Sequence, residues 1–195
     1  MGLLFGSKTE SEVDVVSALK EDHKKVKELF DLFEEAEDRR SKLQIVTQTL
    51  KSLTVHAQVE EEIFYPAFRK ARSAEDETDE LMDEALQEHH VAKILMAELE
   101  DMSPGDKFYD AKYTVLAESV KHHIEEEESE IFPEVDEDEA AWKGVGERLV
   151  ARREELMQGT GKSGGNRNGR QSGQTGRAAS ASRSTGRKSS AKTRR

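Results

Sequence analysis

Apolar residues recur at intervals of three and four along most of residues 12–157, and only three prolines interrupt the whole chain. This spacing places apolar side chains on one face of an α-helix. Between the prolines, the stretches are rich in Ala, Leu, Glu and Lys, which are strong helix formers. No alternation typical of β-strands stands out. The chain is therefore predicted to fold into long amphipathic helices that bury their apolar stripes against one another.

Five helices are predicted from these stripes, over about residues 12–36, 40–71, 78–101, 107–132 and 139–157. The sequence Ser-Pro-Gly-Asp at 103–106 predicts a turn, and Pro133 is expected to end the fourth helix. Four long helices with short connections favour an all-α, up-down four-helix bundle. The short fifth helix offers Trp142, Val145 and Leu149 as a packing face.

Charge divides the chain into two parts. Residues 159–195 hold ten Lys or Arg, no acidic residue and no large apolar residue. Such a segment cannot bury enough surface to offset the entropy of ordering, so it is predicted to be a disordered basic tail rich in Gly, Ser, Arg and Lys. Residues 1–158 carry all 41 acidic residues against 20 basic ones, a formal charge of −21, and are predicted to form the helical domain.

Histidines interrupt each of the four long apolar stripes. Two of them are followed four residues later by a glutamate on the same helical face, and the second stripe continues beyond its glutamate through Ile63 and Ala67. A carboxylate on a core stripe is costly unless it is paired or coordinates a metal. We therefore predict that six side chains converge on a metal site: His23, His56, Glu60, His89, His123 and Glu127.

An internal repeat supports this assignment. The interval from His23 to His56 is 33 residues and that from His89 to His123 is 34, and each His-x-x-x-Glu pair has a proline ten residues after its histidine. The repeat predicts two helical hairpins, each of which supplies one His and one His-x-x-x-Glu pair. Neighbouring His90 and His122 do not fit the pattern and are predicted to lie outside the site.

The absence of cysteine excludes thiolate-bound zinc, cysteine-ligated iron–sulfur clusters and a cysteine nucleophile. Imidazole and carboxylate ligands suit iron, manganese or zinc. Because histidine must be neutral to coordinate, metal binding is expected to weaken as the pH falls through the histidine range.

These motifs resemble the hemerythrin-like HHE cation-binding family over about residues 11–157. The resemblance implies a non-haem centre of two iron ions inside the bundle, with manganese or zinc as alternatives. It implies that the four histidines are terminal ligands and that Glu60 and Glu127 bridge the two ions. The sequence departs from oxygen-carrying hemerythrins, because Lys93 stands where their third helix brings a second histidine and because His123-x-x-x-Glu127 replaces their longer His-to-Asp spacing.

The departures argue against simple oxygen storage. The expected function is sensing of oxygen, nitric oxide or redox state, peroxide handling or iron holding, with O2, NO or peroxide meeting the metal. One alternative is a di-iron enzyme that consumes peroxide or oxidises ferrous ion. Another is a metal-free scaffold whose basic tail binds nucleic acid, which is not favoured. A cytoplasmic location without membrane contact is expected, since no apolar run approaches about 20 residues.

Overall fold

The computed structural model describes residues 13–72, 76–135 and 142–159, which form helices joined by turns, with no β-strand in these ranges. In chain order the elements are α1 (Val15–Glu35), α2 (Arg39–Val59), the π-helix η1 (Glu60–Phe64), α3 (Tyr65–Ala71), α4 (Asp76–Glu100), α5 (Tyr109–Glu126), the π-helix η2 (Glu127–Ile131), the 3₁₀-helix η3 (Phe132–Glu134) and α7 (Val145–Gly159).

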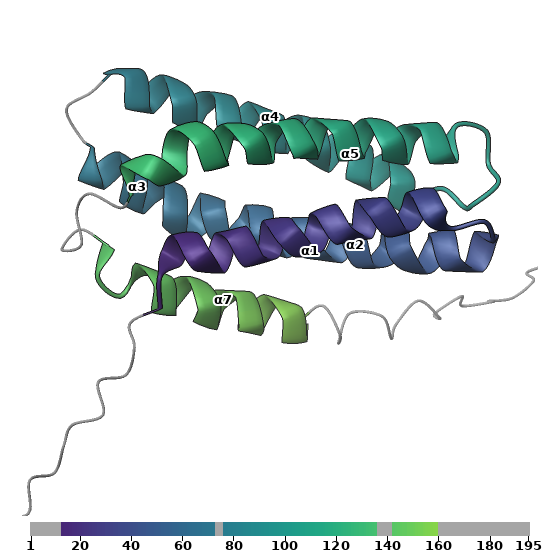
Figure 1. Ribbon diagram of the computed structural model, residues 1–195, viewed down its shortest axis with the longest axis horizontal. Coiled ribbons are helices and arrows are strands. Elements are labelled where there is room, and N and C mark those ends of the chain that lie inside the picture. Colours follow the sequence, from purple (N-terminus) through teal and green to yellow (C-terminus); the bar gives the residue numbers. More distant parts are fainter. Residues whose placement is uncertain (1–12, 73–75, 136–141, 160–195) are drawn as a thin grey trace, which may run out of the picture. The chain divides into compact units, whose positions relative to one another are not determined.

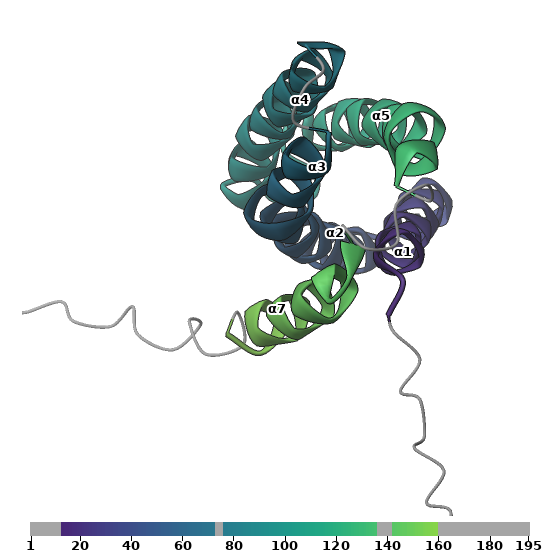
Figure 2. The ribbon, with the colours of Figure 1, turned by 90° about the vertical axis from the view of Figure 1, so that its left-hand side faces the viewer.

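Helices α1, α2, α4 and α5 lie side by side and surround a common centre when they are viewed end-on (Figures 1 and 2). Contacts are most extensive between α1 and α2 and between α4 and α5, so the chain forms two hairpins, while α7 packs outside the four helices against α1 and α2. The predicted four-helix bundle with a shorter additional helix is confirmed. The tail predicted over residues 159–195 lies outside the described residues, except for Gly159, which is the last residue of α7.

Local sequence signals explain where the helices begin. Asp14 caps α1 by accepting a hydrogen bond from the backbone N–H of Val16, and Asp38 caps α2 in the same way for Arg40 and Ser41. The predicted turn between α4 and α5 contains Gly105, whose φ of 102° suits a residue without a side chain.

Two of the predicted helices are not plain α-helices. The segment predicted over 40–71 passes through η1 and that over 107–132 through η2, so each contains a turn with hydrogen bonds from residue i+5 to residue i. From the end of η1 onward the buried face is formed by Phe64, Tyr65 and Phe68, whereas the expected Ile63 and Ala67 are only partly buried. The extra residue of the π turn moves the apolar stripe forward by one position, which a constant helical period does not anticipate.

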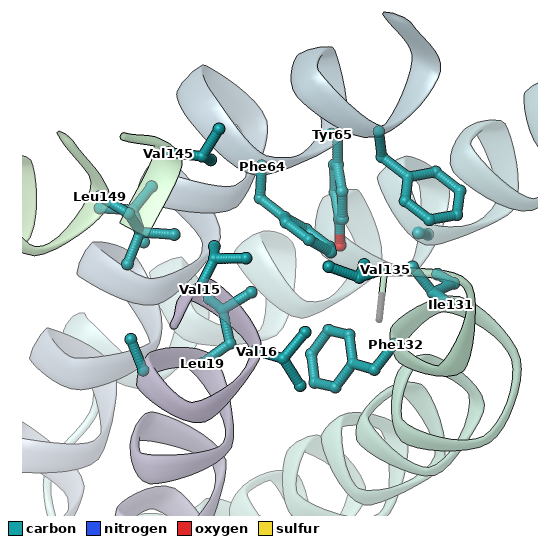
Figure 3. Packing of buried hydrophobic residues seen from close by; sticks show 14 of the residues in the cluster. Val15, Val16, Leu19, Phe64, Tyr65, Ile131, Phe132, Val135, Val145 and Leu149 are labelled. Carbon is teal, nitrogen blue, oxygen red and sulfur yellow. The ribbon is translucent and has the colours of Figure 1, made fainter. Parts of the chain in front are cut away.

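The apolar core consists of two clusters. The first joins the beginning of α1 to η1, α3, η3 and α7, and Figure 3 shows the rings of Phe64, Tyr65 and Phe132 gathered with Val15 and Leu19. The second joins the opposite ends of α1, α2, α4 and α5, and includes buried tyrosines on α5. Polar side chains on the same stripes lie between the two clusters. Among the described helices, none combines the length and apolarity needed to cross a membrane.

Candidate metal centre

All six residues predicted for the metal site lie in the polar layer between the two core clusters, and none is more than 5% exposed. The four long helices each contribute a histidine: His23 on α1, His56 on α2, His89 on α4 and His123 on α5. The two glutamates are the first residues of the two π-helices, η1 and η2. The bundle thus brings all six side chains together.

The first group of possible ligands consists of His23, His56, Glu60 and Glu127, whose ligand atoms lie within 4.8 Å of one another. His56 Nε2 is 3.2 Å from Glu60 Oε1, and His23 Nε2 is 3.2 Å from Glu127 Oε2. Two imidazoles and two carboxylates that face one another in this way can hold one cation of the borderline class.

The second group consists of Glu60, His89 and His123. His89 Nε2 lies 3.3 Å from Glu60 Oε2 and 3.0 Å from His123 Nε2. Glu60 therefore turns one oxygen toward each group, as a bridging carboxylate does. Glu127 differs, because its Oε2 faces both His23 and His123 while its Oε1 accepts a hydrogen bond of 2.9 Å from the hydroxyl of Tyr65.

Carboxylates on the outer side orient three of the imidazoles. The Nδ1 atoms of these rings lie 2.8 to 3.0 Å from carboxylate oxygens, in the pairs His23–Glu128, His89–Glu61 and His123–Glu88. A carboxylate acceptor favours the proton on Nδ1 and leaves the lone pair on Nε2, which is the tautomer that binds a metal through Nε2. In their neutral form, His89 and His123 thus point two lone pairs at each other, an arrangement that a cation would stabilise.

The centre also holds buried polar atoms that lack a hydrogen-bond partner of good geometry: His23 Nε2, both ring nitrogens of His56, both oxygens of Glu60 and Glu127 Oε2. Unpartnered buried polar atoms are costly and uncommon in native proteins. Their concentration between the four helices fits a site for positive ions.

The electrostatics of the histidines reflect the crowded carboxylates. Burial alone would lower the pKa of His23, but the adjacent Glu127 and the charges of Glu60 and Glu128 outweigh it and raise this pKa above 6.5. Burial likewise opposes the raised pKa of His123, which the hydrogen bond to Glu88 and the nearby carboxylates bring about. For His56, burial and the neighbouring His23 lower the pKa well below 6.5.

The two central carboxylates have opposite tendencies. Burial, together with the negative charge of Glu127, raises the pKa of Glu60 well above its ordinary value. Burial also acts to raise the pKa of Glu127, but His23 and His123 overcome it and lower this pKa to about 2. Without a metal, protons on Glu60 and on the histidines therefore take over part of the neutralising role that cations can perform.

Tyr65 and the outer carboxylates were not predicted as parts of the centre. Tyr65 follows Glu60 by five residues, so a regular α-helix would turn it away, whereas η1 places it toward the centre. The sequence did carry a signal for the carboxylates, because Glu61 and Glu128 occupy equivalent positions after Glu60 and Glu127 in the two repeats. The acids that immediately precede the first histidine of each hairpin also have equivalent neighbours, because each lies near the second histidine of its own hairpin. Glu88 bonds to His123, and Asp22 Oδ2 lies 4.0 Å from His56 Nδ1.

Lys93 occupies the position where a second histidine of the third helix would stand. Its Nζ lies 2.5 and 2.7 Å from the two oxygens of Glu61, which is the carboxylate that contacts His89 Nδ1. Lys93 therefore contributes to the outer side of the centre rather than to its ligands. His90 and His122 are exposed, and neither belongs to the two buried groups, as expected.

A mainly apolar pocket lies against one side of the centre. Its lining includes the site histidines of α2, α4 and α5 together with apolar side chains from the second core cluster and its border: Leu53, Ala57, Ala92, Met96 and Val120. Such a lining suits a small uncharged molecule better than an ion.

Comparisons with known proteins bear on the fold and the family of this chain. A curated relative from Nostoc sp. (strain PCC 7120), named a DNA nickase, is 31% identical over 121 residues, which make up 62% of this chain and 33% of the relative. The chain thus spans about a third of that protein. A crystal structure of a hemerythrin HHE cation-binding domain-containing protein from Mycobacterium kansasii shares the fold, with a TM-score of 0.66 and 23% identity over 79% of this chain and 95% of the other.

The family model for the hemerythrin HHE cation-binding domain matches residues 14–135. This range begins at the cap of α1, ends just after η3 and contains all six residues of the centre, while α7 lies beyond it. The chain belongs to the hemerythrin HHE cation-binding domain family.

Proposed function

We propose that the protein binds two iron ions between its four helices and uses them to sense or react with O2, NO or peroxide, or to hold iron. The observation that carries the proposal is the placement of Glu60 between two groups of imidazoles, with one oxygen toward each. His23 and His56 would hold one ion, and His89 and His123 the other. Manganese and zinc suit the same donors, so the choice of iron rests on the family.

The bound ions would supply a redox-active centre that can meet a small ligand. The apolar pocket beside His56, His89 and His123 offers a neutral molecule an approach to the second group of ligands. This group has two imidazoles like the first but one carboxylate fewer, because Glu127 is not part of it. The outer carboxylates hold the imidazoles in the tautomer that binds metal, and burial in the bundle keeps bulk water from the centre. This arrangement favours reaction with a small neutral molecule over transport of an ion.

The proposal is tested by metal analysis of the full-length protein purified aerobically with ample iron. About two irons per chain and the near-ultraviolet absorption of ferric ions are expected. Replacing both bridging candidates, Glu60→Ala with Glu127→Ala, should abolish both signals, whereas the exposed control Glu118→Ala should keep them. Iron-free wild-type protein under these conditions would refute the proposal.

Turnover separates an enzyme from a sensor or a store. A di-iron enzyme should consume hydrogen peroxide, or oxidise ferrous ion, over many cycles per centre. A sensor or store should instead show a single stoichiometric change in absorption when O2, NO or peroxide is added. The same Glu60→Ala, Glu127→Ala protein serves as the blank for each assay.

Contact with nucleic acid is a second candidate. It is supported by the ten basic residues in 159–195 and by the DNA nickase among the relatives, although the similarity spans only a third of that protein. Phosphate contacts made by such a tail would be non-specific and would weaken with salt. A gel shift by the full-length protein at low salt that is lost when residues 159–195 are removed would support this function, and no shift at low salt would dismiss it.

A further inference from the structure

We propose that Glu88, His122 and Glu126 form an outer binding site for a divalent transition-metal cation, at the mouth of a cleft through which the ion reaches the buried centre. This site is separate from the six ligands described above. Its role in loading rests on the proposed metal centre, whereas the binding of a cation at the outer site does not.

The ligand set is the first observation. His122 Nε2 lies 3.2 Å from Glu126 Oε1 and 3.9 Å from Glu88 Oε1, and one ligand atom of each residue lies within 4.8 Å of the others. One imidazole with two carboxylates is a donor set for borderline divalent cations. His122 and Glu126 also repeat the His-x-x-x-Glu spacing of the buried pairs, shifted by one residue to the outer face of α5.

The second observation is a cleft between α4 and the end of α5 that runs from two residues of this cluster, Glu88 and Glu126, toward the interior. Its lining contains Glu84, Glu88, Glu126 and Glu130 together with the buried Glu127 and His123. Glu127 is fully buried, and its Oε2 lacks a hydrogen-bond partner of good geometry. This oxygen faces His23 and His123, so a cation that passes along the acidic cleft would meet the ligands of the proposed centre at Glu127.

Exposure falls in steps along this route. The side chain of His122 is 64% exposed, that of Glu126 is 35%, that of Glu88 is 20%, and that of Glu127 is 1%. Glu88 contacts both the outer site and the buried centre, since its Oε1 faces His122 while its Oε2 accepts a hydrogen bond from His123 Nδ1. Only the carboxylate of Glu88 therefore lies between an ion at the outer site and His123, which is a ligand of the proposed centre.

The charge of the cleft points to a cation as well. Among the described residues that line it, five are glutamates and none is Lys or Arg. Carboxylates gathered along low-dielectric walls attract cations and can speed their association. The pocket on the other side of His123 is mainly apolar and pairs one acid, Glu88, with one base, Lys93, so it lacks the excess negative charge of the cleft and suits a neutral ligand. In this proposal, cations reach the centre through the acidic cleft, and neutral small molecules reach it through the apolar pocket.

Zinc binding at equilibrium tests the outer site. His122→Ala with Glu126→Gln removes two of its ligands while leaving Glu88 in contact with His123. His90→Ala with Glu118→Gln is the matched control, because it removes an exposed histidine from α4 and an exposed glutamate from α5, the two helices that form the outer site, at positions outside the cleft. In equilibrium dialysis of the full-length protein with excess Zn²⁺, the first variant should bind one ion fewer per chain than wild type and the control the same number.

The rate of loading tests the route. When Co²⁺ is mixed with metal-free protein, its visible absorption bands report arrival at the buried ligands. Loading of the His122→Ala, Glu126→Gln protein should be about tenfold slower than that of wild type, at the lower end of what electrostatic focusing supplies, and should reach the same final occupancy. Added salt should slow wild type more than this variant.

The outcomes separate the claims. An unchanged number of bound zinc ions in the His122→Ala, Glu126→Gln protein overturns the outer site. Loss of one zinc with an unchanged cobalt rate overturns the route. Failure of wild-type protein to load cobalt at the centre would count against the proposed function instead, because the zinc difference between the two variants is measured without reference to the buried ligands.

Discussion

The hydroxyl of Tyr65 donates a buried hydrogen bond to the carboxylate of Glu127 at the centre. Burial and the surrounding carboxylates raise the pKa of Tyr65 well above 10, so its hydroxyl stays protonated and donates. Its partner is ionised, because neighbouring imidazoles lower the pKa of Glu127 to about 2. The hydroxyl therefore holds one oxygen of Glu127 and leaves the other for the histidines.

Tyr65→Phe removes this hydroxyl and keeps the ring in the first core cluster. Glu127 then loses the partner of a buried, charged oxygen, and we expect the metal-free protein to lose about 1–3 kcal/mol of unfolding free energy. Tyr113→Phe, which removes a neutral hydrogen bond of 2.7 Å to Thr49, should cost only about 0.5–1.5 kcal/mol. Urea unfolding measures both, and an equal or smaller loss for Tyr65→Phe would contradict this account.

Metal affinity should rise with pH. His23 and His123 have a pKa raised above 6.5, and the pKa of Glu60 is raised above its ordinary value, so the metal-free centre retains protons that an incoming cation must displace. Raising the pH through and above 6.5 removes these protons and strengthens binding. Calorimetric titration with Co²⁺ in buffers of different ionisation enthalpy should show proton release near neutrality that diminishes at higher pH, and an affinity independent of pH would contradict the prediction.

The identity of the six central side chains could be predicted because polar residues on apolar stripes are conspicuous, and the internal repeat paired them. Tyr65 could not be assigned in that way, and the repeat aligns Glu61 with Glu128 without showing that either contacts an imidazole. Glutamates in an acidic run look like a solvated face, and only the packing of the four helices shows which of them contact an imidazole. That each of the six is a metal ligand stays a prediction.

At the level of the elements, the π turns set the geometry of the centre. Each begins at a central glutamate, and each is followed by proline at the start of the next helical segment, at Pro66 or Pro133. The widened turn places the apolar stripe one residue later than an unbroken α-helix would. The central glutamates and the aromatic residues behind them can therefore face the interior together.

Deletion of Glu62, an exposed residue within η1, removes the extra residue of the π turn. The helix can then continue with α-helical bonding while Phe64, Tyr65 and Phe68 keep their inward face, so we expect a cooperatively unfolding bundle that has lost metal affinity. Deletion of the exposed Gln48 in the α-helical part of α2 should be far more damaging, because it rotates the two parts of the stripe by about 100° relative to each other.

Thermal unfolding followed by circular dichroism distinguishes the two deletions. If the deletion of Glu62 abolishes cooperative unfolding as the deletion of Gln48 does, the description of η1 as a one-residue insertion is wrong. The helices themselves could be predicted from their periodicity, and most of their ends lie within a few residues of expectation. The π turns could not, because the same residues are compatible with an unbroken α-helix until the packing of Glu60 and Tyr65 decides between them.

At the level of the whole bundle, each hairpin supplies the two imidazoles of one ligand group. His23 and His56 come from the first hairpin and His89 and His123 from the second, while Glu60 reaches from the first hairpin toward the second pair. Glu127 reaches back toward His23. The sequence repeat predicted that each hairpin supplies one His and one His-x-x-x-Glu pair, but it could not specify which oxygen faces which ring.

Removal of metal should destabilise the bundle. A ligand that binds only the folded state adds about 2.7 kcal/mol per independent site at a free concentration 100 times its dissociation constant. Dialysis against a chelator should therefore lower the melting temperature of iron-loaded protein, and added ferrous ion under nitrogen should restore it. The Glu60→Ala, Glu127→Ala protein should melt at one temperature in both conditions, and a wild-type protein insensitive to chelation would count against ions that join the hairpins.

In the proposed centre, the reach of Glu60 and Glu127 across the hairpins would let the two ions hold the hairpins together as well as react with a small molecule. Without these ions, protons alone would offset the negative charge of the buried carboxylates, and we expect the contact between the hairpins to loosen first. The lifetime of the protein under proteolysis would then report how much iron its surroundings supply.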